Sequence, residues 1–218
     1  MHYTLGAVEG ADDAALVVAW QGGNREAGKL LFERHYSGVA RFFRNKVGTA
    51  EPDLIQRTFL ACVEGLPRLR EVASFRSYLF GIAYKILCKY YQQLRRDRGR
   101  ATVDVDFGAE SAHGLVSPTQ ILAGREEQKL LLAALRRLPV DYQVALELHY
   151  WEGMTAAELG EVLDLPLGTA KTRIRRGRAL LEEQMAALAD SAELLESTRA
   201  NLEVWARQLR AQVLGGQG

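Results

Sequence analysis

Residues 153–181 read GMTAAELGEVLDLPLGTAKTRIRRGRALL, and this stretch says more about the fold than any other. Thr155 and Glu158 have the spacing of a capping box, in which each side chain satisfies a free backbone amide at the start of a helix. Asp164 falls in a turn after an apolar helical face. Pro166 suits the first position of a second helix, where its missing N–H is not needed. The stretch therefore predicts a helix-turn-helix.

The second helix of this motif divides into two sides when its residues are spaced at 3.6 per turn. The side that we expect to be buried carries Ala170, Ile174, Gly177 and Leu181. The opposite side and its flanks carry the candidate DNA-contacting residues Lys171, Thr172, Arg173, Arg175, Arg176 and Arg178. Between residues 171 and 178 no acidic residue stands four positions after a cation. We therefore favour a helix that reads duplex DNA over a solvated surface helix, with donors reaching base edges and flanking cations contacting phosphates.

The net charge of the chain gives little indication of a nucleic-acid partner. Its 218 residues carry a formal charge of +1, and this length leaves room for one or two domains with a real core. The charge is segregated, however. Residues 85–100 hold six cations against Asp97 alone, and the part after residue 181 leans acidic. Local patches of charge, rather than the net charge, determine the affinity for phosphates.

Several classes of function find no support in the sequence. Cys62 and Cys88 are too few for a disulfide framework, and the four His have no metal-ligand spacing, so we expect no metal. A phosphate-binding loop and a nucleophile elbow are both absent from the sequence, so we expect no catalytic residues, no cofactor and no enzyme activity. No apolar run approaches the ~18 residues of a membrane span, which predicts a cytoplasmic protein.

Helical periodicity dominates the rest of the chain, and there is no convincing β alternation. Residues 99–124 lose the periodicity and are rich in Gly and acidic groups, which predicts a linker between two parts. The expected helices are Leu16–Trp20, Glu26–Lys46, Asp53–Leu66, Phe75–Arg96, Glu126–Arg137 and Val140–Trp151, followed by the two helices of the motif.

The end of the chain has a leucine at every seventh position. The series is Leu181, Leu188, Leu195, Leu202 and Leu209, with neither Pro nor Gly between 178 and 214. The spacing predicts one long helix with a leucine seam. This helix either packs back on its own domain or forms a coiled coil with a partner.

The helix expected from Asp53 has two distinct sides. The side that we expect to be buried carries Ile55, Phe59, Cys62, Val63 and Leu66, and the opposite side carries Asp53, Gln56, Arg57, Leu60 and Glu64. An exposed leucine among polar groups suggests a protein-docking ridge, although a single exposed leucine is also common on ordinary surfaces.

The helix expected from Phe75 combines aromatic rings with cations. The buried stripe would carry Phe75, Leu79, Ile82, Ile86 and Tyr90. Off this stripe lie Tyr78, Phe80, Tyr84 and Tyr91, mixed with Arg76, Lys85 and Lys89. Such a mixture is typical of a stacking platform for unpaired bases. The alternative is that helix packing consumes some of the rings.

Four motifs in order carry a resemblance to a known family. They are DLIQRTFL at 53–60, SFRSYLFGIA at 74–83, GMTAAEL at 153–159 and LGTAKTR at 167–173, with Leu-Pro at 138–139. Over about residues 12–185 the chain resembles bacterial RNA polymerase sigma factors of the extracytoplasmic-function group. The resemblance implies an all-α fold with two helical domains joined by a flexible linker, plus a C-terminal helical extension. The implied boundaries are 1–98, 99–124, 125–185 and 186–218.

The resemblance also implies partners and residue roles. Asp53, Gln56 and Leu60 would dock on the clamp helices of the polymerase β′ subunit, and the second domain would meet the β flap. A second set would melt the −10 element and hold its single strand: Ser74, Arg76, Tyr78, Lys85 and Lys89. The six residues of the cationic helix would read the duplex −35 element. An anti-sigma factor is a possible further partner.

Some positions depart from the family pattern, and another class of protein stays open. Tyr78 stands where the family often has Trp, and Tyr84 and Lys85 replace the usual Arg-Asn, so the −10 bases that are recognised can differ. The alternative function is a stand-alone helix-turn-helix regulator that dimerises through its leucine heptads.

Overall fold

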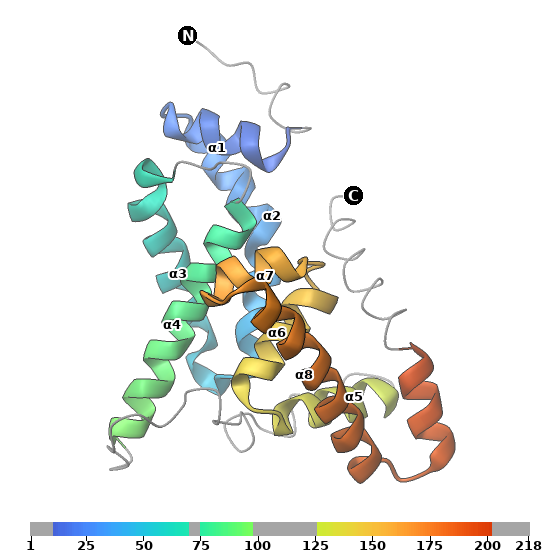
Figure 1. Ribbon diagram of the computed structural model, residues 1–218. Coiled ribbons are helices and arrows are strands. Elements are labelled where there is room, and N and C mark those ends of the chain that lie inside the picture. The colour runs from blue at the N-terminus through green and yellow to red at the C-terminus, as the bar shows by residue number, and fades with distance from the viewer. Residues whose placement is uncertain (1–10, 70–74, 98–125, 202–218) are drawn as a thin grey trace.

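The computed structural model describes residues 11–69, 75–97 and 126–201, and every regular element within them is helical (Figure 1). The linker expected at 99–124 and most of the loop before Phe75 lie outside the described residues, as do Leu202 and Leu209. We refer to residues 13–97 as the N-terminal half and to residues 126–201 as the C-terminal half. The all-α fold expected from the sequence is confirmed for the described part of the chain.

The N-terminal half contains four α-helices: α1 (Asp13–Gln21), α2 (Arg25–Arg44), α3 (Glu51–Gly65) and α4 (Phe75–Asp97). Short 3₁₀ turns at Gly48–Ala50 and Leu66–Arg68 flank α3. Side-chain caps begin the first two helices, because Asp12 accepts a hydrogen bond from the amide of Ala15 at 2.8 Å and Asn24 caps α2 in the same way. These helices pack around buried aliphatic and aromatic side chains from all four of them.

The C-terminal half contains α5 (Glu126–Arg137), α6 (Val140–Tyr150), α7 (Ala156–Leu163) and α8 (Leu167–Leu188). The sequence predicts all four to within a few residues, except for the end of α8. Figure 1 shows α7 beside α4 and near the upper end of α8, and it shows α8 crossing α5. The C-terminal half therefore meets the N-terminal half mainly through α6 and α7.

One apolar core extends across the two halves. It joins buried residues of α2 and α4, such as Phe43 and Phe80, to buried residues of α6 and α7, such as Leu148 and Val162. The two halves are thus closed against each other along the sides of α4 and α7.

Because the two halves pack together, the buried side of α4 differs from the one expected from the sequence. Phe80 and Tyr91 are 0% and 1% exposed, whereas the sequence placed both off the core stripe. Tyr90 and Ile82, expected in the core, are half-buried. The helix has a wider apolar surface than one stripe because α3 packs on one side of it and α7 on another. Phe80 and Tyr91 therefore follow the alternative interpretation, in which helix packing buries some of the aromatic rings.

The expectation of one long helix after residue 181 is wrong for the described residues. The helix α8 ends at Leu188, Ala189 has an extended backbone, and a second helical segment occupies residues 192–201. Ser191 begins this segment by accepting a hydrogen bond from the amide of Leu194 at 3.1 Å. The chain therefore folds back on α5, where Ser197 donates to Glu127 at 3.0 Å.

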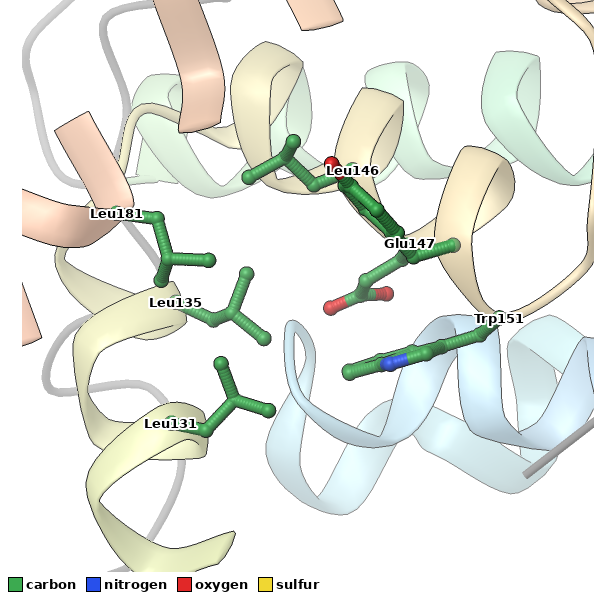
Figure 2. A pocket seen from close by; sticks show the side chains of 7 residues that line it. Leu131, Leu135, Leu146, Glu147, Trp151 and Leu181 are labelled. Atoms are coloured by element: carbon green, nitrogen blue, oxygen red, sulfur yellow. The ribbon is translucent and has the colours of Figure 1, made fainter. Parts of the chain in front are cut away.

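A smaller apolar cluster receives the folded-back segment. It joins α5, α6 and α8, and Leu194 and Leu195 pack against it. Figure 2 shows its centre, where Leu131 and Leu135 of α5 face α6 and α8 side chains around a small hollow. Leu181 and Leu195 of the heptad series thus contribute to the packing of this half.

Candidate functional site

The motif at 153–181 forms the expected helix-turn-helix. The amide of Thr155 donates to Glu158 at 2.8 Å, and the amide of Glu158 donates to the Thr155 hydroxyl at 3.2 Å, which completes the capping box. Asp164 adopts the left-handed conformation with φ of 55°, which ends α7. A Cβ atom at Gly160 would lie 2.8 Å from the carbonyl oxygen of Leu165, so only glycine allows this tight turn.

The helix α8 presents most of its cations to solvent. Ala170, Gly177 and Leu181 are buried as expected, and Ile174 is half-buried. A Cβ atom at Gly177 would lie 3.2 Å from Leu146, so this glycine lets α8 lie close to α6. The exposed cations on the opposite side are Lys171, Arg175, Arg176 and Arg178. Donors on one face of a helix whose other face is anchored suit a DNA groove.

Two cations of the set on α8 are paired. Arg173 donates to the Asp141 carboxylate at 2.9 Å, and its side chain is 21% exposed. Arg178 pairs with Glu182 at 3.1 Å, an acidic partner four positions on that lies just beyond the cationic run. Thr172 donates its hydroxyl to the carbonyl of Gly168 at 2.9 Å. Within the part of the chain that the structure describes, Lys171, Arg175 and Arg176 are the exposed cations of the set that form no ion pair.

The candidate −10 residues are divided between solvent and the interface with the C-terminal half. Lys85 and Lys89 are exposed on α4, one turn apart. Arg76 contacts Glu158 of α7 at 2.9 Å. Tyr78 is half-buried beside α3, where a Cβ atom at Gly65 would lie 1.9 Å from the Tyr78 hydroxyl. Ser74 lies outside the described residues.

A cationic hollow lies between α3 and the C-terminal part of α4. Its volume is about 370 Å³, and it is lined by Arg57, Lys89, Tyr90, Gln92, Gln93 and Arg96. Of these lining residues, Lys89 was predicted from the sequence to contact the −10 element, and the others were not predicted as site residues. The signal was present in the cationic run at 85–100, but only the packing of α3 against α4 brings Arg57 beside it.

The expected docking surface on α3 is exposed. Asp53 and Gln56 are exposed, and Leu60 is 57% exposed. Val63 was expected in the core but is 44% exposed, because Leu54 and Thr58 occupy the buried side of this helix instead. Leu60 and Val63 are therefore two apolar side chains one turn apart on the exposed side of α3.

A buried charge pair joins the two halves. Lys46, two residues after the end of α2, pairs with Glu147 of α6 and also donates to the carbonyl of Phe42 at 2.5 Å. Burial lowers the pKa of Lys46 and raises the pKa of Glu147, while the ion pair opposes both shifts. Gln143 adds a hydrogen bond to Glu147 at 2.9 Å.

The described residues offer no group of three or more His, Cys, Asp or Glu side chains that would hold a metal ion. Among the same residues, no helix combines the length and apolar character needed to cross a bilayer.

Comparisons with known proteins find a matching family model and several similar proteins. A family model described as "Sigma-70, region 4" matches residues 128–181. The sigma-E factor of RNA polymerase from Haemophilus influenzae, of the extracytoplasmic-function group, is 26% identical over 183 residues, which covers 79% of this chain and 95% of the relative. The corresponding Escherichia coli K12 factor is 26% identical over 179 residues, with coverage of 79% and 94%.

Two solved structures share the fold. CnrH in complex with the cytosolic domain of CnrY has a TM-score of 0.60 and 23% identity, covering 81% of this chain and 99% of that chain. The sigma factor RpoE from Bartonella quintana, in complex with the anti-sigma factor NepR, has a TM-score of 0.52 and 20% identity, with coverage of 74% and 96%.

Proposed function

Because the chain belongs to the extracytoplasmic-function group of the sigma-70 family, we propose that it is an alternative sigma factor that directs core RNA polymerase to promoters. It binds core polymerase and promoter DNA, reads a −35 and a −10 element, and promotes melting of the duplex at the start of transcription. The observation that carries this function is the exposed cationic side of α8 within the part matched by sigma-70 region 4.

We assign −35 reading to α8 and the turn before it. Lys171, Arg175 and Arg176 are exposed and free to reach base edges or phosphates, while Thr172 and Arg173 lie at the edge of the buried side. Arg178 is one turn further along, where it would contact the DNA backbone. An arginine that donates two hydrogen bonds to a guanine gives base discrimination, whereas a phosphate contact gives affinity without discrimination.

We assign −10 melting to α4 and the loop before it, including Ser74. Lys85 and Lys89 would attract the strand, and the rings of Tyr78 and Tyr84 would stack on unpaired bases. Capture of a base outside the duplex favours the melted state, because stacking on protein replaces stacking within DNA.

We assign polymerase docking to α3. Asp53, Gln56 and Leu60 form its exposed ridge, and Val63 extends the apolar part. The expected partner is the clamp of the β′ subunit, with the β flap contacting the C-terminal half. On this assignment residues 1–98 bind polymerase and the −10 element, and residues 125–185 bind the −35 element. Residues 99–124 connect these two parts, and residues 186–218 form a C-terminal extension.

The alternative of a stand-alone dimeric regulator is not favoured. The leucine seam that would form its dimer interface packs instead on the chain's own α5 and α8 through residue 195. We also propose that the protein is not an enzyme, since sigma factors generally act by binding, and that it works in the cytoplasm with the chromosome. An anti-sigma factor is a further proposed partner, as NepR is for the Bartonella quintana protein.

A promoter library tests the function. Purified core polymerase transcribes the library with and without the protein, and the start sites are mapped. We expect start sites that depend on the protein and share elements near −35 and −10. Duplex binding without any new start site would contradict the proposal and favour the stand-alone regulator.

A further inference from the structure

The cationic hollow receives side chains from two helices. Figure 1 shows α3 and α4 lying side by side. The helix α4 contributes Lys89, Gln92, Gln93 and Arg96, whose spacing of three and four positions places them on one side of the helix. The helix α3 contributes Arg57. Of these residues only Lys89 has a role in the proposed function, so the rest of the hollow has no assigned ligand.

The charges around the hollow suit an anion. The residues that line it include Arg57, Lys89 and Arg96, all exposed, and no acidic side chain. Arg57 pairs with Asp53 at 3.5 Å, and these two side chains are 52% and 67% exposed. Because an ion pair between exposed groups contributes little, the guanidinium of Arg57 can exchange Asp53 for another anion at little cost. Within the described part of the chain, Lys89 and Arg96 form no ion pair at all.

The kinds of cation in the hollow indicate phosphate groups. A guanidinium donates two parallel hydrogen bonds to one phosphate, whereas an ammonium acts as a point charge with three donors. Arg57 would approach a ligand from α3, while Lys89 and Arg96 would approach it from α4. Three cations from two sides match a ligand with at least two adjacent phosphates better than one with a single phosphate.

The lining also contains an aromatic ring that is held in place. Tyr90 is half-buried, and its hydroxyl donates to the carbonyl of Val47 at 3.4 Å. Its ring lies nearly perpendicular to the ring of Tyr91, with the two centroids 5.6 Å apart. A ring with a fixed position can stack on a base. The amides of Gln92 and Gln93 add donors and acceptors beside it.

The size and the surroundings of the hollow favour a compact ligand over a long strand. Its volume of about 370 Å³ falls within the range of sites for small molecules. Arg57 is the only cation in α3, and the other exposed charges of this helix are Asp53 and Glu64. A nucleic-acid strand that crossed from α4 over α3 would meet these carboxylates. The positive charge on α3 is therefore confined to the hollow.

We propose that the hollow is a binding site for a nucleoside polyphosphate, a small ligand with an aromatic base and at least two adjacent phosphates. Arg57, Lys89 and Arg96 bind the phosphates, and the base stacks on Tyr90. The amides of Gln92 and Gln93 lie at the edge of the base or the sugar. This site goes beyond the proposed function, and its test needs neither polymerase nor a promoter.

Variants of exposed residues test the phosphate contacts. Arg57→Gln combined with Arg96→Gln removes two cations of the hollow at exposed positions, so the fold should persist, which circular dichroism checks. Arg25→Gln combined with Arg137→Gln removes the same charge from exposed positions of α2 and α5 and is the control. Tyr90→Leu removes the ring, whereas Tyr90→Phe keeps the ring and removes only the hydroxyl.

The measurement is the fluorescence anisotropy of ATP with a fluorescent label on its ribose, titrated with the full chain. We expect saturable binding by the wild type. The double arginine variant of the hollow should bind at least about tenfold more weakly, because hydrogen bonds to charged groups are lost. Tyr90→Leu should bind at least about fivefold more weakly, because stacking is lost. Tyr90→Phe and the control should match the wild type.

Unlabelled competitors identify the kind of ligand. Adenosine should not displace the labelled ATP at concentrations where ATP does, and inorganic triphosphate should displace it less well than ATP. A single-stranded oligothymidylate with the same number of phosphates should also compete less well than ATP.

Four outcomes would each overturn the proposal. The first two are the absence of saturable binding and an unchanged affinity in the double arginine variant of the hollow. Triphosphate that competes as well as ATP would show a simple anion site without recognition of a base. Oligothymidylate that competes as well as ATP would show that the hollow belongs to the path of a nucleic-acid strand.

Discussion

Lys46, which follows α2, and Glu147 of α6 form an ion pair across the two halves of the molecule, and their side chains are 0% and 3% exposed. The pair lies beside the small hollow lined by α5, α6 and α8 side chains, toward which Figure 2 shows the Glu147 carboxylate pointing. Neither side chain could be placed in this pair from sequence, because the partners are 101 positions apart.

Removal of one partner of this pair should be far more damaging than removal of both. Lys46→Met leaves a buried carboxylate without its cation and should lower the free energy of unfolding by about 3–5 kcal/mol. Lys46→Met with Glu147→Met should come within about 1 kcal/mol of the wild type or exceed it. Urea unfolding followed by circular dichroism gives both values, and a single variant as stable as the double variant would contradict this reading.

The ridge on α3 should be needed for polymerase but not for folding. Leu60→Glu places a charge in the proposed apolar contact and should weaken binding to core polymerase at least about tenfold. Its free energy of unfolding should change by less than about 0.5 kcal/mol because the site is exposed. Val18→Glu is a matched control, since Val18 of α1 is also 57% exposed. Equal losses from the two variants would argue against a specific docking ridge.

Replacement of Arg176 should show whether its side chain reads a base or contacts a phosphate. If its guanidinium makes a bidentate base contact, Arg176→Ala should lose about 1–3 kcal/mol of promoter binding and relax the preference at one −35 position. A loss that is uniform over all sequences would instead identify a phosphate contact. Binding of a −35 library by the polymerase complex measures this, with Arg25→Ala, an exposed cation of α2, as the control.

The start of α1 should contribute to the loss of stability in acid. Burial alone would raise the pKa of Asp13, but His35 and Arg34, at 2.7 and 2.6 Å, outweigh it and lower the pKa. A lowered pKa means that the contribution is complete above the ordinary Asp value and is lost as the pH falls through the lowered value. Asp13→Asn should therefore reduce the difference in unfolding free energy between about pH 5 and pH 2.

The comparison variant for this test is Asp97→Asn, because Asp97 is an exposed Asp at the end of α4. The same pH series on this variant should reproduce the wild-type curve more closely. If Asp13→Asn leaves the acid sensitivity unchanged, the cluster at α1 does not act in the way described.

The folded-back segment should stabilise the C-terminal half. Leu194→Ser with Leu195→Ser removes two side chains from the cluster of α5, α6 and α8 and should lower the free energy of unfolding by roughly 2 kcal/mol, since both are only partly buried. The variant should have the same mass in solution as the wild type, because the seam packs internally. A change from dimer to monomer in sedimentation experiments would show that the seam also joins chains.

Local signals predicted the helix-turn-helix well. The capping box and the place of Asp164 in the turn were predicted because they depend on residues a few positions apart. The left-handed conformation of Asp164 and the contact of Gly160 with the carbonyl of Leu165 came from the structure. The exposed side of α8 follows from the same helical spacing. The cations on it were therefore placed from sequence, although their contacts with DNA stay a prediction.

Contacts between segments that are far apart in the chain could not be predicted from the sequence. The burial of Phe80 depends on a neighbour from α2, Phe42, at a ring distance of 5.9 Å, and the pairing of Arg173 depends on Asp141 of α6. Helical spacing predicts one buried stripe, as for a helix that packs against one neighbouring helix, but α4 packs against helices on two sides. The end of α8 at Leu188 was not predicted, because the seven-residue leucine spacing continues past it. Asp190 and Ser191 are nevertheless residues that favour the start of a new helix.

The proposed function is tested most sharply by the binding of one promoter, recovered from the library, to the protein alone, to core polymerase alone and to the two together. Fluorescence anisotropy of the labelled promoter and of a scrambled sequence measures each affinity. Only the combination should prefer the promoter over the scrambled sequence. A preference of the same size for the protein alone, unaffected by polymerase, would contradict the proposed function and identify a stand-alone DNA-binding protein.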